Sequence, residues 1–330
     1  MRPLLAYKIP STLLSVVAIV MMSCTGDDPP GKRTKGAFPT DPTQAQLIGS
    51  DVDLFWRAFD ELLADTSKNP LQSEYLDKGT DGLRDFIADE RIKSAEALKE
   101  LVLMEADYYR RIRPSSERYL QYEEPIRDSY RKLKDLYPDA VFPPVYFVIG
   151  RTTSGGTASK HGLIIGMEIM SSTPDTTAYG RPTLPLDDIP YIVAHEIIHF
   201  LQVDDTTDQS LLAHCMREGT ADLIAELTAG ERVKALNGDD VYPYGERHMT
   251  ELLQEFSTRA SSDDLSGWLY SSAPGGRPQN LGYWMGYRIA KHYYDQAADK
   301  HKAIHELLHI PNYREFVDRS GFFEQVKSAR

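Results

Sequence analysis

The segment Tyr191 to Gln202 reads YIVAHEIIHFLQ and carries three ionisable side chains in a mostly apolar run. His195 and His199 are four residues apart, so in an α-helix they lie on one face about 6 Å apart and can direct ring nitrogens to one point. A zinc ion at roughly 2.1 Å from each nitrogen fits this spacing. Glu196 is rotated by about 100° from His195, which places its carboxylate beside the metal. There it can take a proton from a water molecule and pass it to a leaving group.

Three fixed positions make a short motif, and histidines inside helices are frequently core or surface residues without a ligand. The neighbours of this motif are apolar: Ile192, Val193, Ile197, Ile198, Phe200 and Leu201. Ionisable groups that are desolvated among such neighbours need a partner or a metal. This context favours a metal site, while a helical protein without any metal stays open as an alternative.

A catalytic zinc ion needs a third protein ligand and an open fourth position. The next expected helix, roughly residues 209–229, supplies Glu218 and Asp222, which are again four apart and share one face. We expect Glu218 to bind the metal and Asp222 to accept the spare N–H of a ligand histidine, which fixes its tautomer. The alternative is a pair of solvated acids, but the apolar neighbours in this helix favour burial.

The order HEIIH, Glu218, Asp222 resembles the gluzincin family of HExxH metalloproteases. The resemblance implies three zinc ligands, His195, His199 and Glu218. It also implies that Glu196 is the general base and that Asp222 supports a histidine. The rival metzincin pattern has a third histidine in HExxHxxGxxH, and this chain continues with FLQ instead.

A wider resemblance covers residues 51–322. The order VYFVIGRTTSGGT, HGLIIGMEIM, HExxH, EGTAD and GYWMGYRIAKHYY is similar to uncharacterised bacterial families of predicted zinc-dependent proteases, including gliding-motility-associated lipoproteins. The resemblance implies a zincin-like fold and a zinc-dependent peptidase that hydrolyses a peptide or peptide-like amide bond. The gliding-related relatives leave a second possibility, a catalytically idle zincin that acts as a structural or assembly lipoprotein.

One further pattern concerns the substrate. Gly166-Met167-Glu168 precedes HEIIH by about the interval at which GxMEN precedes HExxH in certain zinc aminopeptidases, whose glutamate holds the free amino group of the substrate. Ile169 stands where that motif has asparagine. The resemblance implies that Glu168 binds substrate, and the alternative is a polar residue on an exposed strand edge. Such an edge could still bind an extended peptide by strand addition.

A peptidase also needs a donor that stabilises the oxyanion. Tyr283, Tyr287 and His292 lie on the helix expected around residues 281–294, and Tyr287 is preferred for its place beside Gly286. The alternative for each is packing in the core.

Apolar residues recur at helical spacing through the first third of the chain, in four segments around residues 51–63, 83–87, 95–103 and 119–137. Two short runs, Val145 to Ile149 and Gly162 to Met167, have the length and β-branched content of strands. A Gly/Ser/Thr loop too short for a helix joins them, so we expect adjacent antiparallel strands. In the late helix, Gly282 and Gly286 are one turn apart and allow close approach to another backbone. The expected fold is α+β and rich in helix, with a small, mostly antiparallel sheet and an HExxH active-site helix in one domain, residues 46–330.

The first residues have a different character. Arg2 and Lys8 precede an uncharged run that ends at Ser23-Cys24. This is typical of a bacterial lipoprotein signal, so we expect a signal peptide at 1–23 and a lipidated Cys24; a secretory signal or a single membrane anchor are the alternatives. Residues 24–45 are rich in Asp, Pro, Gly, Lys and Thr and are expected to form a flexible tether. The expected location is the bacterial cell envelope, on the periplasmic or cell-surface side.

The composition of the chain limits the kinds of molecule that it is expected to bind. The 330 residues are 41% hydrophobic and carry a net charge of -12, which argues against nucleic acid because phosphate binding needs a basic face. Besides Cys24 the chain has only Cys215, so no internal disulfide is expected in the exported domain. We expect a peptide or protein substrate, and a membrane bound through the lipid anchor.

Overall fold

The computed structural model describes residues 38–173, 183–203, 207–230, 241–270 and 276–324. The amino-terminal part is helical, as the apolar spacing predicts. Its α-helices are α1 (Ser50–Ala64), α2 (Asp81–Ala88), α3 (Ala95–Met104), α4 (Ala106–Ser116) and α5 (Glu123–Leu136). Shorter helical segments are η2 (Pro42–Gln44), η3 (Leu71–Leu76) and η4 (Tyr119–Tyr122). Thr80 and Ser94 cap α2 and α3 by accepting the N–H groups of Leu83 and Ala97.

A four-stranded sheet lies beside these helices, in the order β1-β2-β4-β3. Its strands are β1 (Leu47–Ile48), β2 (Val145–Val148), β3 (Gly156–Ala158) and β4 (Leu163–Gly166). Strands β2, β3 and β4 are buried along their whole length. The α-rich α+β class expected from the sequence is confirmed.

The expected antiparallel pairing of the two long runs is wrong, because β2 and β4 are parallel. The connecting loop contains β3, which runs opposite to β4 with Thr157 paired to Ile164. The chain therefore reverses twice, once into β3 and once at the hairpin where Ser159 N–H donates to Gly162. Since β1 also runs parallel to β2, the sheet is mixed and not mostly antiparallel.

Two helices form the centre of the molecule, α7 (Ile189–Leu201) and α8 (Leu211–Ala229). They are preceded by α6 (Met167–Met170) and η6 (Leu186–Asp188). Pro190 stands in the first turn of α7, where its missing N–H costs nothing. Ser210 caps α8 through Ala213 N–H, and α8 ends at Gly230 with φ 101°.

The carboxyl-terminal helices are α10 (Val241–Arg247), α11 (Met249–Arg259), α12 (Leu281–Gln296), α13 (Lys300–Leu308) and α14 (Tyr313–Ser320). Helix α12 packs directly against α8. A Cβ atom added to Gly286 would lie 1.7 Å from the carbonyl oxygen of Cys215, and one added to Gly219 would lie 2.0 Å from Tyr287 N. The predicted close approach of α12 to another backbone is confirmed.

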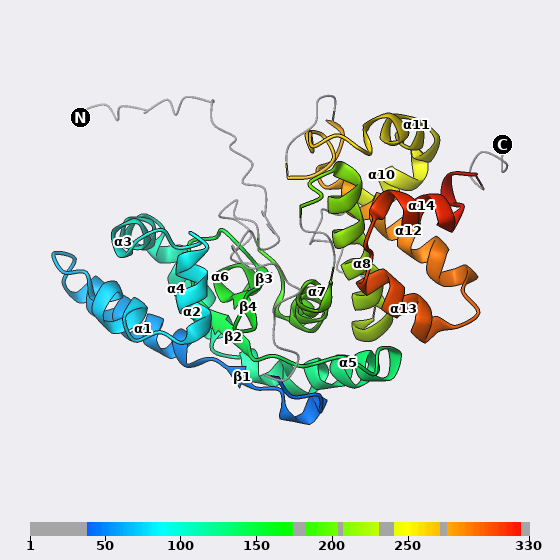
Figure 1. The fold of residues 1–330 in the computed structure, drawn as a ribbon. Helices are drawn as coiled ribbons and strands as arrows, with labels where there is room; N and C mark the ends of the chain where they lie inside the picture. Colours follow the sequence, from blue (N-terminus) through cyan, green and yellow to red (C-terminus); the bar gives the residue numbers. More distant parts are fainter. Residues whose placement is uncertain (1–37, 174–182, 204–206, 231–240, 271–275, 325–330) are drawn as a thin grey trace, which may run out of the picture.

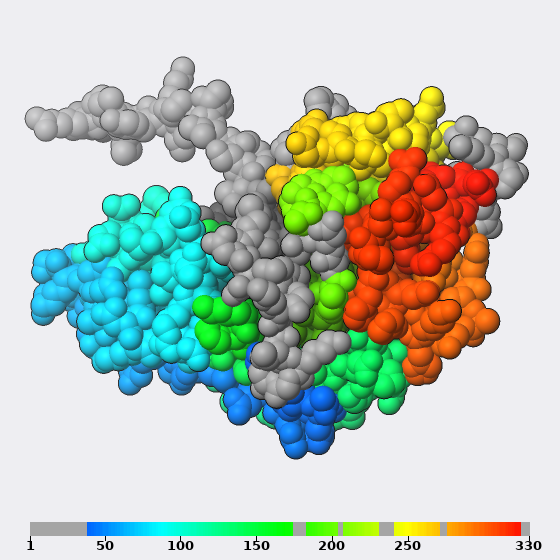
Figure 2. Space-filling model, in the orientation of Figure 1, coloured from blue at the N-terminus to red at the C-terminus, as the bar shows by residue number. Residues whose placement is uncertain are grey.

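The helices divide into two groups around α7 and α8 (Figure 1). Helices α1 to α4 lie on one side with the sheet, and α10 to α14 lie on the other. The same division is visible on the face drawn in Figure 2, where blue and cyan residues gather opposite yellow to red ones. Side chains of α7 belong to the first hydrophobic core and those of α12 to the second, whereas α8 contributes to both.

Residues 38–45, which the sequence analysis assigns to the tether, pack on the domain. The Phe38 ring meets Phe200 of α7 edge-on at 5.3 Å, and Ala45 is buried. Arg127 donates to the carbonyl oxygens of Pro42 and Thr43. The packed chain therefore begins before residue 46.

The expected signal peptide, Cys24 and the first part of the tether lie outside the described residues. Within the described ranges, no helix combines the length and the apolarity needed to cross a bilayer.

Candidate metal centre

Helix α7 presents two imidazoles to one point. His195 and His199 are four residues apart on this helix, and their Nε2 atoms are 3.0 Å apart. His195 is fully buried, and His199 keeps a tenth of its side chain exposed. The geometry predicted from HEIIH is therefore present.

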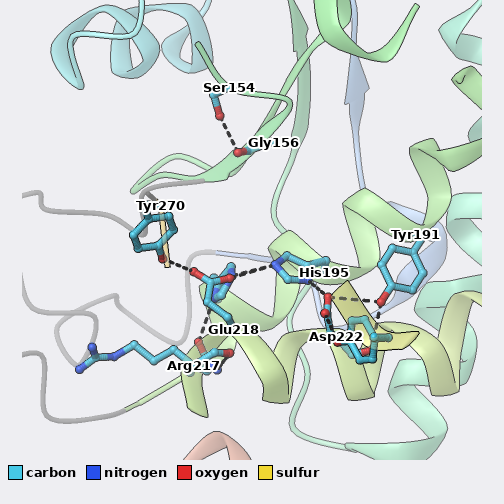
Figure 3. Close-up of polar contacts among 11 residues, drawn as sticks. Ser154, Gly156, Tyr191, His195, Arg217, Glu218, Asp222 and Tyr270 are labelled. Carbon is cyan, nitrogen blue, oxygen red and sulfur yellow. Dashed lines mark hydrogen bonds and ion pairs between the residues drawn. The ribbon is translucent and has the colours of Figure 1, made fainter. Parts of the chain in front are cut away.

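Helix α8 adds a carboxylate to the same point (Figure 3). Glu218 Oε2 lies 3.4 Å from His195 Nε2 and 3.2 Å from His199 Nε2. Around a tetrahedral zinc ion with bonds of about 2.1 Å, two ligand atoms are separated by about 3.4 Å. The three observed separations match the edges of one face of such a tetrahedron.

The outer nitrogen of His195 is held by Asp222, as predicted. His195 Nδ1 lies 3.0 Å from Asp222 Oδ1, and a carboxylate can only accept here, so Nδ1 carries the proton and Nε2 presents its lone pair. Asp222 also accepts the hydroxyls of Tyr191 at 3.3 Å and Tyr242 at 2.7 Å. These contacts fix both the tautomer and the orientation of the ring.

The outer nitrogen of His199 is held by Gln202, a residue that the sequence analysis did not identify. Gln202 Nε2 donates to the Arg217 carbonyl oxygen at 2.9 Å, so its Oε1 faces His199 Nδ1 at 3.0 Å as an acceptor. His199 therefore also presents the Nε2 lone pair. The only local signal was the spacing of three residues from His199, which is too common to be recognised by itself.

Two tyrosines complete the surroundings. The Tyr270 hydroxyl donates to Glu218 Oε1 at 2.9 Å, which leaves Oε2 directed at the histidines (Figure 3). The Tyr283 ring stacks on His195 with ring centroids 6.3 Å apart. Tyr270 comes from the segment before α12 and has no periodic relation to the motif, so no sequence pattern pointed to it.

The donor set fits a zinc ion. Glu218 Oε2 is buried and faces the two Nε2 atoms, and when both of these present lone pairs it has no hydrogen-bond donor among the described residues. A buried carboxylate oxygen without a partner is costly, and a cation bound there would remove that cost. His195, His199 and Glu218 together offer two nitrogens and one oxygen, the set typical of catalytic zinc sites with one position left open.

The electrostatics of the cluster favour positive charge. Burial lowers the pKa of His195, but Asp222 and Glu218 outweigh it and raise the pKa to about 10. Burial raises the pKa of Glu218, but His199 and His195 outweigh it and hold the pKa well below its usual range. A divalent cation supplies the charge that this cluster otherwise takes from protons.

Glu196 lies beside the cluster, as expected for a residue rotated by 100° from His195. It is buried, and its Oε1 has no hydrogen-bond partner in the described part of the chain. Burial raises the pKa of Glu196, against the effect of His195 and His199. An acid of raised pKa with a free oxygen is suited to exchanging a proton with water, so the geometry is consistent with the predicted general base.

Glu168 does not lie on an exposed strand edge. It is fully buried at the start of α6, and its two oxygens accept the backbone N–H groups of Gly150 and Thr152. This placement favours a structural role, and substrate binding by Glu168 stays a prediction.

Tyr287 does not join the metal cluster. Its hydroxyl donates to Glu226 Oε1 at 3.0 Å, two turns along α8 from Glu218. His292 is also remote, with Nε2 3.1 Å from the Ser320 carbonyl oxygen. The packing of α12 on α8 turns the Tyr287 hydroxyl toward Glu226, whereas Tyr283 of the same helix stacks on His195. A role of Tyr287 as oxyanion donor stays a prediction.

Comparison with known families agrees with this site. Residues 162–315 match a family described as "Predicted Zn-dependent protease". The matched stretch contains all three candidate ligands, Glu196 and Asp222. No curated protein and no solved structure matches the chain. The family match and the geometry of the cluster confirm the resemblance to HExxH zinc proteases and the expectation of Zn²⁺ as the cofactor.

Proposed function

We propose that the protein is a zinc-dependent peptidase that hydrolyses a peptide or peptide-like amide bond at the bacterial cell envelope. The observation that carries the activity is the convergence of His195, His199 and Glu218 beside the free carboxylate oxygen of Glu196. Neither feature alone is sufficient, because three ligands without a base would serve as well in a structural site.

The residues divide the chemistry between them. A zinc ion bound by the three ligands would polarise a water molecule and the substrate carbonyl. Glu196 takes a proton from the attacking water and returns it to the departing amine. Asp222 and Gln202 keep the two imidazoles in the tautomer that binds a metal, and Tyr270 keeps Glu218 oriented toward them.

Strand β3 suggests how the substrate lies. It is the outer strand of the described sheet, and a Cβ atom added to Gly156 would lie 2.7 Å from Glu196 Oε1. An extended peptide that added to this edge would run beside the carboxylate. This arrangement favours a polymer substrate over a small free amide.

Metal analysis combined with cleavage of a mixed peptide library tests the activity. Glu218→Ala should lose zinc and turnover, because it removes one of three ligands. Glu226→Ala, on the same helix but directed at Tyr287, is the matched control and should keep both. Glu196→Gln should keep zinc and lose on the order of a thousandfold in kcat. A wild-type protein that binds zinc and cleaves no peptide in the library would instead favour the catalytically idle assembly lipoprotein.

The envelope location rests on the sequence around Cys24. Radioactive palmitate should label the wild type expressed in a bacterial host, and Cys24→Ala should abolish the label and release the protein from the membrane fraction. Membrane association that persists in Cys24→Ala without label would indicate an uncleaved anchor in place of a lipid.

A further inference from the structure

Glu168 forms an unusual anchor for a loop. Its Oε2 accepts Gly150 N–H at 2.8 Å and its Oε1 accepts Thr152 N–H at 2.9 Å. Burial raises the pKa of Glu168 to about 7, against the effect of these N–H groups. Burying an acid in this way is costly, so the anchor is expected to hold something that the fold or the function needs fixed.

The anchored segment, residues 149–156, is held from the helical side as well. The Tyr75 hydroxyl donates to the Ile149 carbonyl oxygen at 2.7 Å, and the Tyr109 hydroxyl donates to that of Gly150 at 2.8 Å. The Tyr108 hydroxyl donates to the carbonyl oxygen of Glu168 itself. The start of the segment is therefore fixed on two sides by buried hydrogen bonds.

The far end of the same segment reaches the metal centre. Ser154 Oγ donates to the Gly156 carbonyl oxygen at 2.7 Å, at the start of β3 (Figure 3). A Cβ atom on Gly156 would lie 2.7 Å from Glu196 Oε1 and 2.9 Å from Glu196 Cγ. The space between Gly156 and the Glu196 side chain is therefore too small for a Cβ atom, and we call the Gly156 backbone at this position the Gly156 wall. A shift of this backbone would change the space open to the Glu196 carboxylate.

We propose that Glu168 is a positioning residue for Glu196: by binding the amides of Gly150 and Thr152 it fixes residues 150–156 and thereby the Gly156 wall. The proposal rests on the proposed role of Glu196 as general base. It gives Glu168 a role in catalysis that requires no contact with substrate.

Glu168→Gln tests the anchor, because an amide oxygen can accept only one of the two N–H groups and the amide nitrogen faces the other. Hydrogen exchange should show lower protection in peptides covering residues 149–156, with α7 and α8 unchanged. The kcat should fall about tenfold, while KM and zinc content stay within about twofold.

Asp51→Asn is the matched control. Asp51 is likewise fully buried and accepts the Thr80 N–H at 3.0 Å, but its contact lies between α1 and α2. Loss of this hydrogen bond should lower thermal stability and leave both hydrogen exchange at residues 149–156 and kcat unchanged.

If Glu168→Gln does not fold, Ser154→Ala tests the other end of the same segment with a milder change. It removes the hydrogen bond to the Gly156 carbonyl oxygen and should lower kcat about threefold.

A double-mutant cycle distinguishes an effect of Glu168 on the position of Glu196 from a general loss of structure. In a Glu196→Gln background, Glu168→Gln should add little further loss of kcat, because both changes act on the same carboxylate. Equal losses in both backgrounds would overturn the proposal, as would full protection of residues 149–156 in Glu168→Gln. A wild type without peptidase activity would refute the proposed function, and the exchange experiment would still decide whether Glu168 holds the segment.

Discussion

The metal cluster and the Glu168 anchor are both buried and both contain carboxylates, but they differ in which of their oxygens have hydrogen-bond donors nearby. In the anchor, each oxygen of Glu168 accepts a backbone N–H. In the cluster, the outer nitrogens of His195 and His199 face Asp222 and Gln202, and the inner atoms of the two histidines and Glu218 face one another. Within the described ranges, the buried carboxylate oxygens that lack a hydrogen-bond partner belong to Glu196 and Glu218.

This difference distinguishes carboxylates that hold the fold together from carboxylates that can bind a ligand or exchange a proton. A buried acceptor without a partner costs about 1–3 kcal/mol, so folds rarely retain one unless a ligand or a reaction uses it. Both oxygens of Glu168 already accept hydrogen bonds, so this residue can influence the site only through the backbone segment that it binds. The comparison therefore supports the proposed direct roles of Glu196 and Glu218 and the proposed indirect role of Glu168.

The strongest test of this comparison joins the two regions at Gly156. Gly156→Ala should push the Glu196 side chain from its place and lower kcat about 100-fold with zinc retained, because misplacing a catalytic group by about 1 Å has effects of this size. Steady-state kinetics and metal analysis measure both quantities. Gly155→Ala is the control, since its added carbon would lie 3.2 Å from Ile169 Cγ2 and away from Glu196. Equal losses in the two variants would indicate damage to the loop instead.

A smaller effect is expected from the outer bonds of the cluster. Asp222→Asn removes the charge that orients His195 and should weaken zinc binding about 30-fold, within the range found for such partners of metal ligands. Competition with a chelator measures the affinity. Tyr242→Phe removes one hydroxyl bonded to Asp222 and should weaken binding by less. An unchanged affinity in Asp222→Asn would mean that packing alone orients the imidazole.

The role of Tyr270 predicts a still smaller change. Tyr270→Phe frees Glu218 Oε1 and should weaken zinc binding about threefold, because one hydrogen bond to a charged group is lost while the ligand stays. Tyr287→Phe is the matched control, since its hydroxyl bonds Glu226. A larger loss of kcat in Tyr287→Phe than in Tyr270→Phe would restore the oxyanion role expected from the sequence.

The smallest effect concerns an acid outside both regions. Burial, with a smaller contribution from Asp187, raises the pKa of Asp188 from 3.8 to about 6. Because the pKa is higher in the folded state than in the unfolded state, protonated Asp188 favours the folded state. This contribution to stability is fully present below pH about 4 and is lost as the pH rises through 6. Asp188→Asn should raise Tm by about 1–2 °C at pH 7.5 and leave it unchanged at pH 4, as followed by circular dichroism. A Tm gain of equal size at both pH values would exclude titration as the cause.

The sequence predicts the cluster well because its information is local. His195 and His199 share a helix face, as do Glu218 and Asp222, and helical periodicity places both pairs without knowledge of the fold. That the two faces meet could be expected only through the resemblance to a known motif. The packing of α7 on α8 that brings them together is a tertiary property.

The features that sequence reasoning missed are nonlocal or too short to detect. Tyr270 reaches Glu218 across 52 residues, and Glu168 binds amides 16 and 18 residues before it. The parallel pairing of β2 and β4 was missed because β3 has three small residues, GTA, inside a loop of similar composition. Such a strand is defined by its partner β4 and not by its own β-propensity.

The contact between Gly219 and Gly286 has a mechanical consequence. Glu218 directly precedes Gly219, so the third expected ligand lies next to the point where the backbones of α8 and α12 approach without a side chain between them. The two backbones approach so closely here that we expect α8 and α12 to move together. If the proposed site opens to admit a peptide, we therefore expect the movement between α7 and α8, on the side of β3, and not between α8 and α12.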